Sequence, residues 1–205
     1  FTSHGKWWQN RFHESTDTTV AYNTAGTWTA NAITSLTSGK RHILEVFASR
    51  TQLAVSNGNV VKQYDTSYAN TTDLTIPSDY EVIGMAYNNA RLGIITRLGT
   101  DSVGQNTEAR FYIWRGAGTA ADSDASVGAY ACVAVRAYKS SFVVLNSAGQ
   151  LLYWNGGGFD ELAHFPFYTD QHTWGDLVNF FSYGDNMVVD GDVIYINLAL
   201  QLSRY

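Results

Sequence analysis

The chain has 205 residues, of which 45% are hydrophobic, 14% aromatic and 15% charged, a composition that supports one sizeable buried core and excludes a disordered chain. The formal net charge is -5 with a pI of about 5.4 and no strong cluster of Lys and Arg, so a nucleic-acid partner is not expected. No apolar run approaches the ~18 residues of a membrane-spanning helix, and no secretory signal is visible, so no membrane insertion is expected.

The first 41 residues differ from the rest, being rich in Thr, Asn, Ser and Trp. Residues 19–22 and 27–29 are candidate strands around a polar turn. This stretch is expected to be an N-terminal arm, part of a sheet or the end of a preceding domain. Because the chain begins at Phe1 and not at Met, we expect it to be trimmed, processed or excerpted from something longer.

Four later stretches repeat one pattern: an apolar strand, a small polar turn, a second strand, a Gly-bearing turn and a third strand. They are residues 43–64, 82–114, 132–154 and 178–197. The Gly-bearing turns are Asn57-Gly58, Ser147-Ala148-Gly149 and Asp190-Gly191. Asn-Gly and Asp-Gly favour the positive φ angles of tight hairpins. In the second stretch the turn is enlarged to residues 98–108, which predicts a surface excursion.

The third strands align through an aromatic residue near their ends. Trp154 follows Trp114 by 40 residues, and Tyr64 precedes Trp114 by 50. Pro77 and Pro166 each close a fourth strand, where proline is tolerated because an outer strand need not donate every backbone N–H. Each unit is therefore a series of four antiparallel strands.

A period of roughly 40 to 50 residues with four strands per unit is typical of β-propeller blades. We expect an all-β fold, a β-propeller-like array of four-stranded antiparallel blades that is incomplete or part of a larger propeller. Residues 1–41 form an N-terminal arm or partial blade. The blades span about residues 42–80, 81–128, 129–170 and 171–205, the last cut short. Open sheet edges would need residues 1–41 or a partner to cover them.

Two features that could indicate chemistry have simpler interpretations. The glycine run at residues 156–158 precedes a strand, whereas a phosphate-binding loop needs a helix behind it, so a linker between strands is favoured. Cys132 is the only cysteine and lies in the apolar run at residues 131–135, which predicts a buried, inert thiol.

No cofactor, metal ligand set or catalytic residue is predicted. The five histidines have no compact metal spacing and are expected to be exposed or capped; they are His4, His13, His42, His164 and His172. Asp185, Asp190 and Asp192 crowd one hairpin and could hold calcium through oxygen ligands, although turn chemistry explains them equally well. No Gly-x-Ser-x-Gly elbow is present.

The aromatic residues divide into two groups. Tyr64, Trp114 and Trp154 lie on strands and are candidate aromatics of the core between blades. Trp7, Trp8 and Trp174 lie in polar surroundings and are candidate contacts for a partner protein or a glycan, because aromatic side chains are favoured at buried interfaces.

The segments EVFASRTQLAVSNGNVVKQY, IPSDYEVIGMAYNNARLGIITR and SSFVVLNSAGQLLYWNGGGFDELAHFP resemble, in cadence and turn style, virion structural proteins of tailed bacteriophages that contain a β-propeller, such as tail nozzle, hub and neck components. The resemblance covers about residues 42–197. It implies a structural protein of the virion tail or neck, with no catalysis and no cofactor, that assembles with other virion proteins as a homo-oligomeric ring or larger assembly. It carries no site residue over, and the shortened last blade departs from a complete propeller.

Three functions follow in order of preference. The first is a non-catalytic structural component of a bacteriophage particle that acts through protein–protein assembly. The alternative is a carbohydrate-binding, receptor-binding propeller lectin that recognises a host surface glycan through exposed aromatics. The third is a glycoside-acting enzyme, which needs paired carboxylates in a cleft.

Overall fold

The computed structural model describes residues 4–47, 51–98, 108–128, 132–146, 148–165 and 187–196. Within these ranges every helix or strand is a β-strand. The strands form four four-stranded sheets and one two-stranded sheet, all antiparallel, and each sheet is a simple meander in chain order. The fold class predicted from the sequence is therefore confirmed.

The first sheet contains β1 (Gly5–Trp8), β2 (Arg11–Ser15), β3 (Val20–Thr24) and β4 (Thr27–Ile33). The second contains β5 (Leu44–Phe47), β6 (Gln52–Asn57), β7 (Val60–Tyr64) and β8 (Asn70–Thr75). The third contains β9 (Tyr80–Asn88), β10 (Arg91–Leu98), β11 (Ala109–Trp114) and β12 (Ser123–Gly128). The fourth contains β13 (Cys132–Tyr138), β14 (Ser141–Asn146), β15 (Gln150–Trp154) and β16 (Phe159–His164), and the last contains β17 (Met187–Asp190) and β18 (Val193–Ile196).

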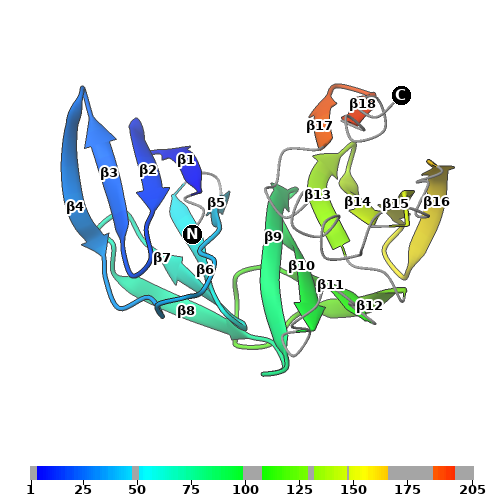
Figure 1. Ribbon diagram of the computed structural model, residues 1–205, viewed down its shortest axis with the longest axis horizontal. Coiled ribbons are helices and arrows are strands. Elements are labelled where there is room, and N and C mark those ends of the chain that lie inside the picture. The colour runs from blue at the N-terminus through cyan, green and yellow to red at the C-terminus, as the bar shows by residue number, and fades with distance from the viewer. Residues whose placement is uncertain are drawn as a thin grey trace, which may run out of the picture.

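The sheets follow one another around an open arc (Figure 1). The first strand of each sheet lies on the inside of the arc, where β1 contacts β5, β5 contacts β9, β9 contacts β13 and β13 contacts β17. The fourth strands lie on the outside. The face that a sheet turns toward the preceding sheet is its backward face, and the opposite face is its forward face.

Four separate hydrophobic cores fill the spaces between successive sheets. In β14, Phe142 and Val144 belong to the core shared with the third sheet, whereas Val143 and Leu145 belong to the core shared with the last sheet. Successive side chains of a strand point to opposite faces, so a strand with both faces covered reads as a continuous apolar run. That is why β14 is buried along its whole length.

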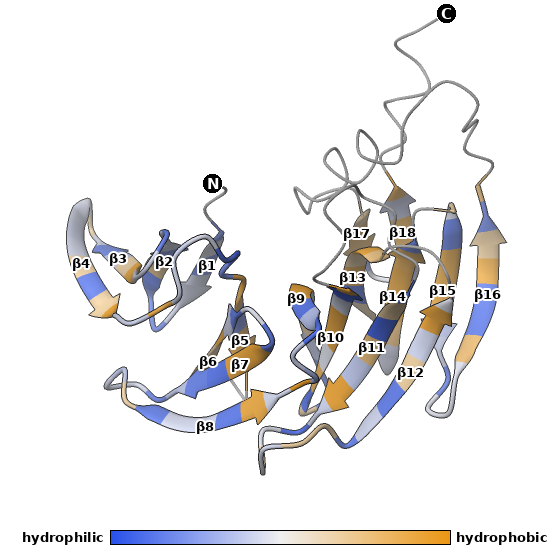
Figure 2. Cartoon of the chain, turned by 60° about the horizontal axis from the view of Figure 1, so that its bottom comes forward, coloured by the Kyte–Doolittle hydropathy of each residue, from blue (hydrophilic) through white to orange (hydrophobic). Residues whose placement is uncertain are grey.

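The outer strands follow a different rule. β16 has no fully buried residue, and β12 has one. Figure 2 shows the same contrast, with apolar residues dominating β14 and mixed or polar residues on β12 and β16. Outer strands project beyond the contact between neighbouring sheets. Their polar side chains therefore stay hydrated and carry no desolvation penalty.

The segment before residue 42 is the main departure from the sequence-based expectation. It holds a full four-stranded sheet from Gly5 to Ile33, so neither an arm nor a partial blade describes it. Its two tight hairpins turn at Gln9-Asn10 and Ala25-Gly26, and all four residues have positive φ. Two-residue hairpins need such φ values, but Gln and Ala seldom adopt them, so the sequence carries a weak turn signal.

Candidate functional site

The three strand-borne aromatics lie between sheets. Tyr64 belongs to the core between the first and second sheets, and Trp114 to the core between the second and third. Trp154 belongs to the core between the third and fourth sheets. Trp114 is fully buried and stacks on Phe47, with ring centroids 5.7 Å apart. Each therefore lies on the backward face of its sheet, packed against the sheet before it.

The neighbouring residues Trp7 and Trp8 point to opposite faces of the first sheet. Trp8 is only 2% exposed and contacts the rings of His13 and Tyr68, so its assignment as a contact for a partner or glycan is wrong. Trp7 is 67% exposed and remains available. Trp174 lies outside the described residues.

A row of side chains crosses the backward face of the first sheet. Trp7 is in register with Phe12, Phe12 with Asn23, and Asn23 with Trp28. The rings of Trp7 and Phe12 meet edge to face at 5.8 Å, and those of Phe12 and Trp28 at 6.4 Å. A Cβ on Gly5 would lie 2.3 Å from the Phe12 ring, so glycine at this position makes room for the row. No described segment covers this aromatic row.

The forward face of the last sheet carries three exposed apolar side chains together with the exposed carboxylate of Asp190. Val188 is in register with Tyr195, and Val193 follows on the same face one step along the hairpin. The other face, with Met187, Val189 and Ile194, packs against the fourth sheet. One face of the last sheet is therefore covered, and no described segment covers the other.

Exposure is concentrated on these two end faces. Among the described residues, six large apolar side chains are exposed. Two of them, Trp7 and Trp28, lie on the aromatic row, and three lie on the forward face of the last sheet: Val188, Val193 and Tyr195. The sixth is Leu162 on the outer strand β16. Contiguous exposed apolar patches mark interaction sites, whereas scattered single residues do not.

The inner strands line a cavity of about 680 Å³. Lys6 Nζ lies 2.8 Å from Glu45 Oε1 and 2.9 Å from Oε2 across this space, and Arg136 also lines the cavity. Burial raises the pKa of Glu45 despite the opposing effect of Lys6. The ion pair therefore joins the inner strands β1 and β5 at the centre of the arc.

Two histidines are fully buried, contrary to the expectation that they would be exposed or capped. His13 Nε2 lies 3.0 Å from Tyr68 Oη, and burial lowers the pKa of His13. The ring nitrogens of His42 lie 2.9 and 3.0 Å from the carbonyls of Ser56 and Asp17. Both histidines tie the first sheet to the second, because buried polar groups need hydrogen-bond partners.

The remaining chemical candidates are structural where they are described. Within the described ranges no group of three His, Cys, Asp or Glu residues could hold a metal ion; Asp190 and Asp192 are exposed, and Asp185 falls outside those ranges. Burial raises the pKa of the Cys132 thiol, as the apolar run predicted. The glycine run is a strand connection in which Asn155 Oδ1 accepts bonds from the N–H groups of Gly157 and Gly158. No helix in the described part has the length and apolar character to cross a bilayer.

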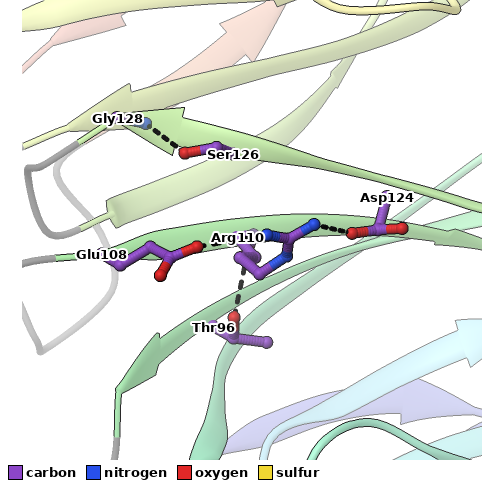
Figure 3. A network of polar contacts seen from close by, with 6 residues as sticks. All are labelled: Thr96, Glu108, Arg110, Asp124, Ser126 and Gly128. Atoms are coloured by element: carbon purple, nitrogen blue, oxygen red, sulfur yellow. Dashed lines mark hydrogen bonds and ion pairs between the residues drawn. The ribbon is translucent and has the colours of Figure 1, made fainter.

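A polar network closes one end of the third sheet (Figure 3). The Arg110 guanidinium donates to Glu108, 3.1 Å away, and to Asp124. Thr96 Oγ1 donates to the Arg110 carbonyl at 3.1 Å. The network links β10, β11 and β12 next to the enlarged turn, and its ion pairs raise the pKa of Arg110. Its partners all belong to one sheet, so the network stabilises the sheet and leaves no open ligand site of its own.

Comparison with known proteins adds the fold type. No protein-family model and no curated protein sequence matches the chain. The crystal structure of Raptor from Chaetomium thermophilum superposes with a TM-score of 0.60 at 12% identity, over 84% of this chain and 16% of that one. The chain has a β-propeller fold. The N-terminal domain of Nup159 superposes with a TM-score of 0.47 at 11% identity, over 77% of this propeller chain and 46% of that one. This chain thus spans under half the length of either structure.

Proposed function

We propose that this chain is a non-catalytic structural component of a larger particle, acting through protein–protein contacts at its two end faces. The observation that carries the proposal is the concentration of exposed large apolar side chains on the aromatic row and on the forward face of the last sheet. Every apolar face between successive sheets is covered by the next sheet. No described segment covers the two end faces, and burying apolar surface is the main driving force of association.

The particle we propose is the tail or neck of a bacteriophage virion. Support comes from the resemblance of residues 42–197 to propeller-containing virion proteins.

Purified particles from the source of the chain test this function. The expected result is a stoichiometric band for this chain, with chemical cross-links from neighbouring virion proteins to the first and last sheets. Tyr195 and the Lys6 region are suitable reporter positions. Absence of the chain from washed particles would overturn the virion assignment.

A glycan is the second candidate ligand, because Trp7 and Trp28 are 67% and 50% exposed on one face of the first sheet. The polar Asn23 lies between Phe12 and Trp28 in the same row, so the face offers ring surfaces together with an amide. A broad glycan panel should then show saturable binding that Trp28→Ala removes and Leu162→Ala leaves intact. No binding across the panel would eliminate the lectin function.

A further inference from the structure

A hydrogen-bonded contact of Arg11, His13 and Tyr68, called the latch below, joins the first sheet to the second. Arg11 and His13 lie on β2 of the first sheet, and Tyr68 lies in the turn between β7 and β8 of the second. We propose that the latch is controlled by pH: uptake of a second proton by the His13 ring releases Tyr68 from the first sheet and exposes Trp8. The latch is internal to the chain and does not rest on the proposed function.

The hydrogen-bond partners fix where each proton of the closed latch lies. His13 Nδ1 is 3.2 Å from the Arg11 carbonyl, which can only accept, so Nδ1 carries the ring proton. His13 Nε2 then has a lone pair, and Tyr68 Oη, 3.0 Å away, donates to it. Arg11 Nη1 in turn donates to Tyr68 Oη at 3.4 Å. The cycle from Arg11 through Tyr68 to His13 and back to Arg11 is therefore complete only when the His13 ring is neutral.

A second proton on His13 breaks this cycle at Tyr68. An imidazolium ring donates from both nitrogens, so Tyr68 Oη would face two donors, His13 Nε2 and Arg11 Nη1, and its own proton would lose its acceptor. The new charge would also be fully buried. Burial, and after it the charge of Arg11, lowers the pKa of His13 against the opposing effect of the Arg11 carbonyl. Protonation therefore favours a state in which the His13 ring reaches water.

Other described groups around His13 are engaged with partners of their own. Lys6, in register with His13 on β1, lies 2.8 Å from a carboxylate oxygen of Glu45. Tyr22, in register on β3, turns an aromatic ring to His13, with centroids 5.7 Å apart. Asp65, at the start of the turn that carries Tyr68, accepts hydrogen bonds from within that turn. The charge balance at His13 therefore depends on the latch residues themselves.

The turn that carries Tyr68 can move without losing its own structure. Asp65 Oδ1 accepts from two backbone N–H groups of the same turn, at 2.8 and 3.0 Å. Tyr68 has a φ of 64°, a left-handed conformation that residues other than glycine seldom adopt and that persists only where contacts hold it. Its ring meets that of Trp8 edge to face at 5.7 Å and stacks on that of Tyr22 at 5.7 Å. Withdrawal of Tyr68 therefore uncovers two aromatic rings of the first sheet.

His42 is the matched contrast, because it is also fully buried between the first and second sheets. Its ring nitrogens lie 2.9 and 3.0 Å from two carbonyl oxygens, those of Ser56 and Asp17. A second proton on His42 would place a donor opposite an acceptor, whereas on His13 it places a donor opposite a donor. Replacing His42 should therefore leave the response of the latch to pH intact, and replacing His13 should remove it.

Two measurements on the full chain test the latch. Long-range proton–nitrogen NMR of the histidine rings at about pH 7.5, above the ordinary histidine pKa, reports the tautomer. We expect a neutral His13 ring that is protonated at Nδ1, and a ring protonated at Nε2 would overturn the proposal. Hydroxyl-radical labelling at about pH 7.5 and about pH 5, on either side of that pKa, reports the exposure of Trp8. Trp7 is the exposed reference and Trp114 the buried one.

The reactivity of Trp8 should rise on acidification. Because the closed latch lowers the pKa of His13, the closed state is favoured above the ordinary pKa of about 6.5 and is lost as pH falls toward the lowered pKa. Within that interval the ratio of open to closed latch should increase about tenfold per pH unit, since one proton is taken up on opening. Trp8 of unchanged reactivity would overturn the latch, and so would Trp114 becoming reactive together with Trp8, because that marks global unfolding.

Three variants assign the response to the latch. His42→Gln should keep the rise in Trp8 reactivity. His13→Gln cannot titrate and should give the same Trp8 reactivity at both pH values. Tyr68→Phe keeps the ring but lacks the hydroxyl that joins Arg11 to His13, so it should give a smaller rise. An undiminished rise in the His13 or the Tyr68 variant, or its loss in a folded His42 variant, would overturn the proposal.

Discussion

Truncating the Trp114 side chain should lower the free energy of unfolding strongly, whereas truncating Trp7 should lower it only slightly. The Trp114 side chain is fully buried, and an aromatic of this size covers roughly 200 Å², worth about 5 kcal/mol at ~25 cal/mol per Å². Measured truncations of buried Trp cost about 3–5 kcal/mol. Trp114→Ala should therefore lower the free energy of unfolding by about 4 kcal/mol. Trp7, two-thirds exposed, should cost about 1 kcal/mol.

Urea unfolding followed by far-UV circular dichroism measures both values without relying on tryptophan fluorescence. Trp114→Phe provides an intermediate case, because it keeps a ring against Phe47 but loses the bond from Trp114 Nε1 to the Gly118 carbonyl, 3.3 Å long. We expect about half the loss of the alanine variant. Equal losses for Trp114→Ala and Trp7→Ala would refute the assignment of one residue to the core and the other to an open face.

Three further predictions concern single positions. Gly93→Ala should lower the free energy of unfolding in urea by about 1–3 kcal/mol, because the new Cβ would lie 2.8 Å from the Phe142 ring. The control Gly157→Ala, where a Cβ would meet nothing within 4 Å, should change it by less than about 0.5 kcal/mol. Burial lowers the pKa of His13 in the folded state. The stability that neutral His13 contributes is therefore complete above the unfolded pKa of about 6.5 and falls as pH drops through the folded pKa. His13→Gln should make the free energy of unfolding less dependent on pH between about pH 7.5 and pH 5.5. Cys132 should react with a thiol reagent slowly when folded and rapidly in denaturant, because burial raises its pKa; equal rates would contradict the buried position.

The repeat was visible in the sequence because an aromatic residue ends the third strand of successive sheets, 50 and then 40 residues apart. Trp114 and Trp154 end equivalent strands. The turns at Asn57-Gly58 and Asp190-Gly191 have positive φ at glycine, as Asn-Gly and Asp-Gly pairs predict for tight hairpins. The second, third and fourth sheets begin at Leu44, Tyr80 and Cys132; the blade boundaries at about residues 42, 81 and 129 stay a prediction.

Sequence reasoning found only half of the first sheet. The candidate strands at residues 19–22 and 27–29 correspond to β3 and β4, whereas β1 and β2 were not predicted. The hairpin between β1 and β2 turns at Gln9-Asn10, where Gln adopts a backbone conformation that it seldom favours. Short strands of mixed composition between such turns look like an irregular polar segment.

The candidate site was only half predictable. Trp7 and Trp8 are adjacent in similar polar surroundings, and only the pairing register shows that Trp7 joins the aromatic row while Trp8 faces the core. Strict alternation along residues 5–8 could have separated them had the strand been recognised. The burial of His42 depends on carbonyls of Ser56 and Asp17 brought from other sheets, a tertiary arrangement that leaves no pattern in the sequence.

Hydroxyl-radical footprinting of the chain, free and in its associated state, tests most directly whether the end faces are binding surfaces. Trp7, Trp28 and Tyr195 should lose most of their reactivity on association, while Leu162 keeps its reactivity and Trp114 stays unreactive in both states. Unchanged reactivity at Trp7, Trp28 and Tyr195 in an associated sample would show that the chain assembles through other surfaces and would contradict the account.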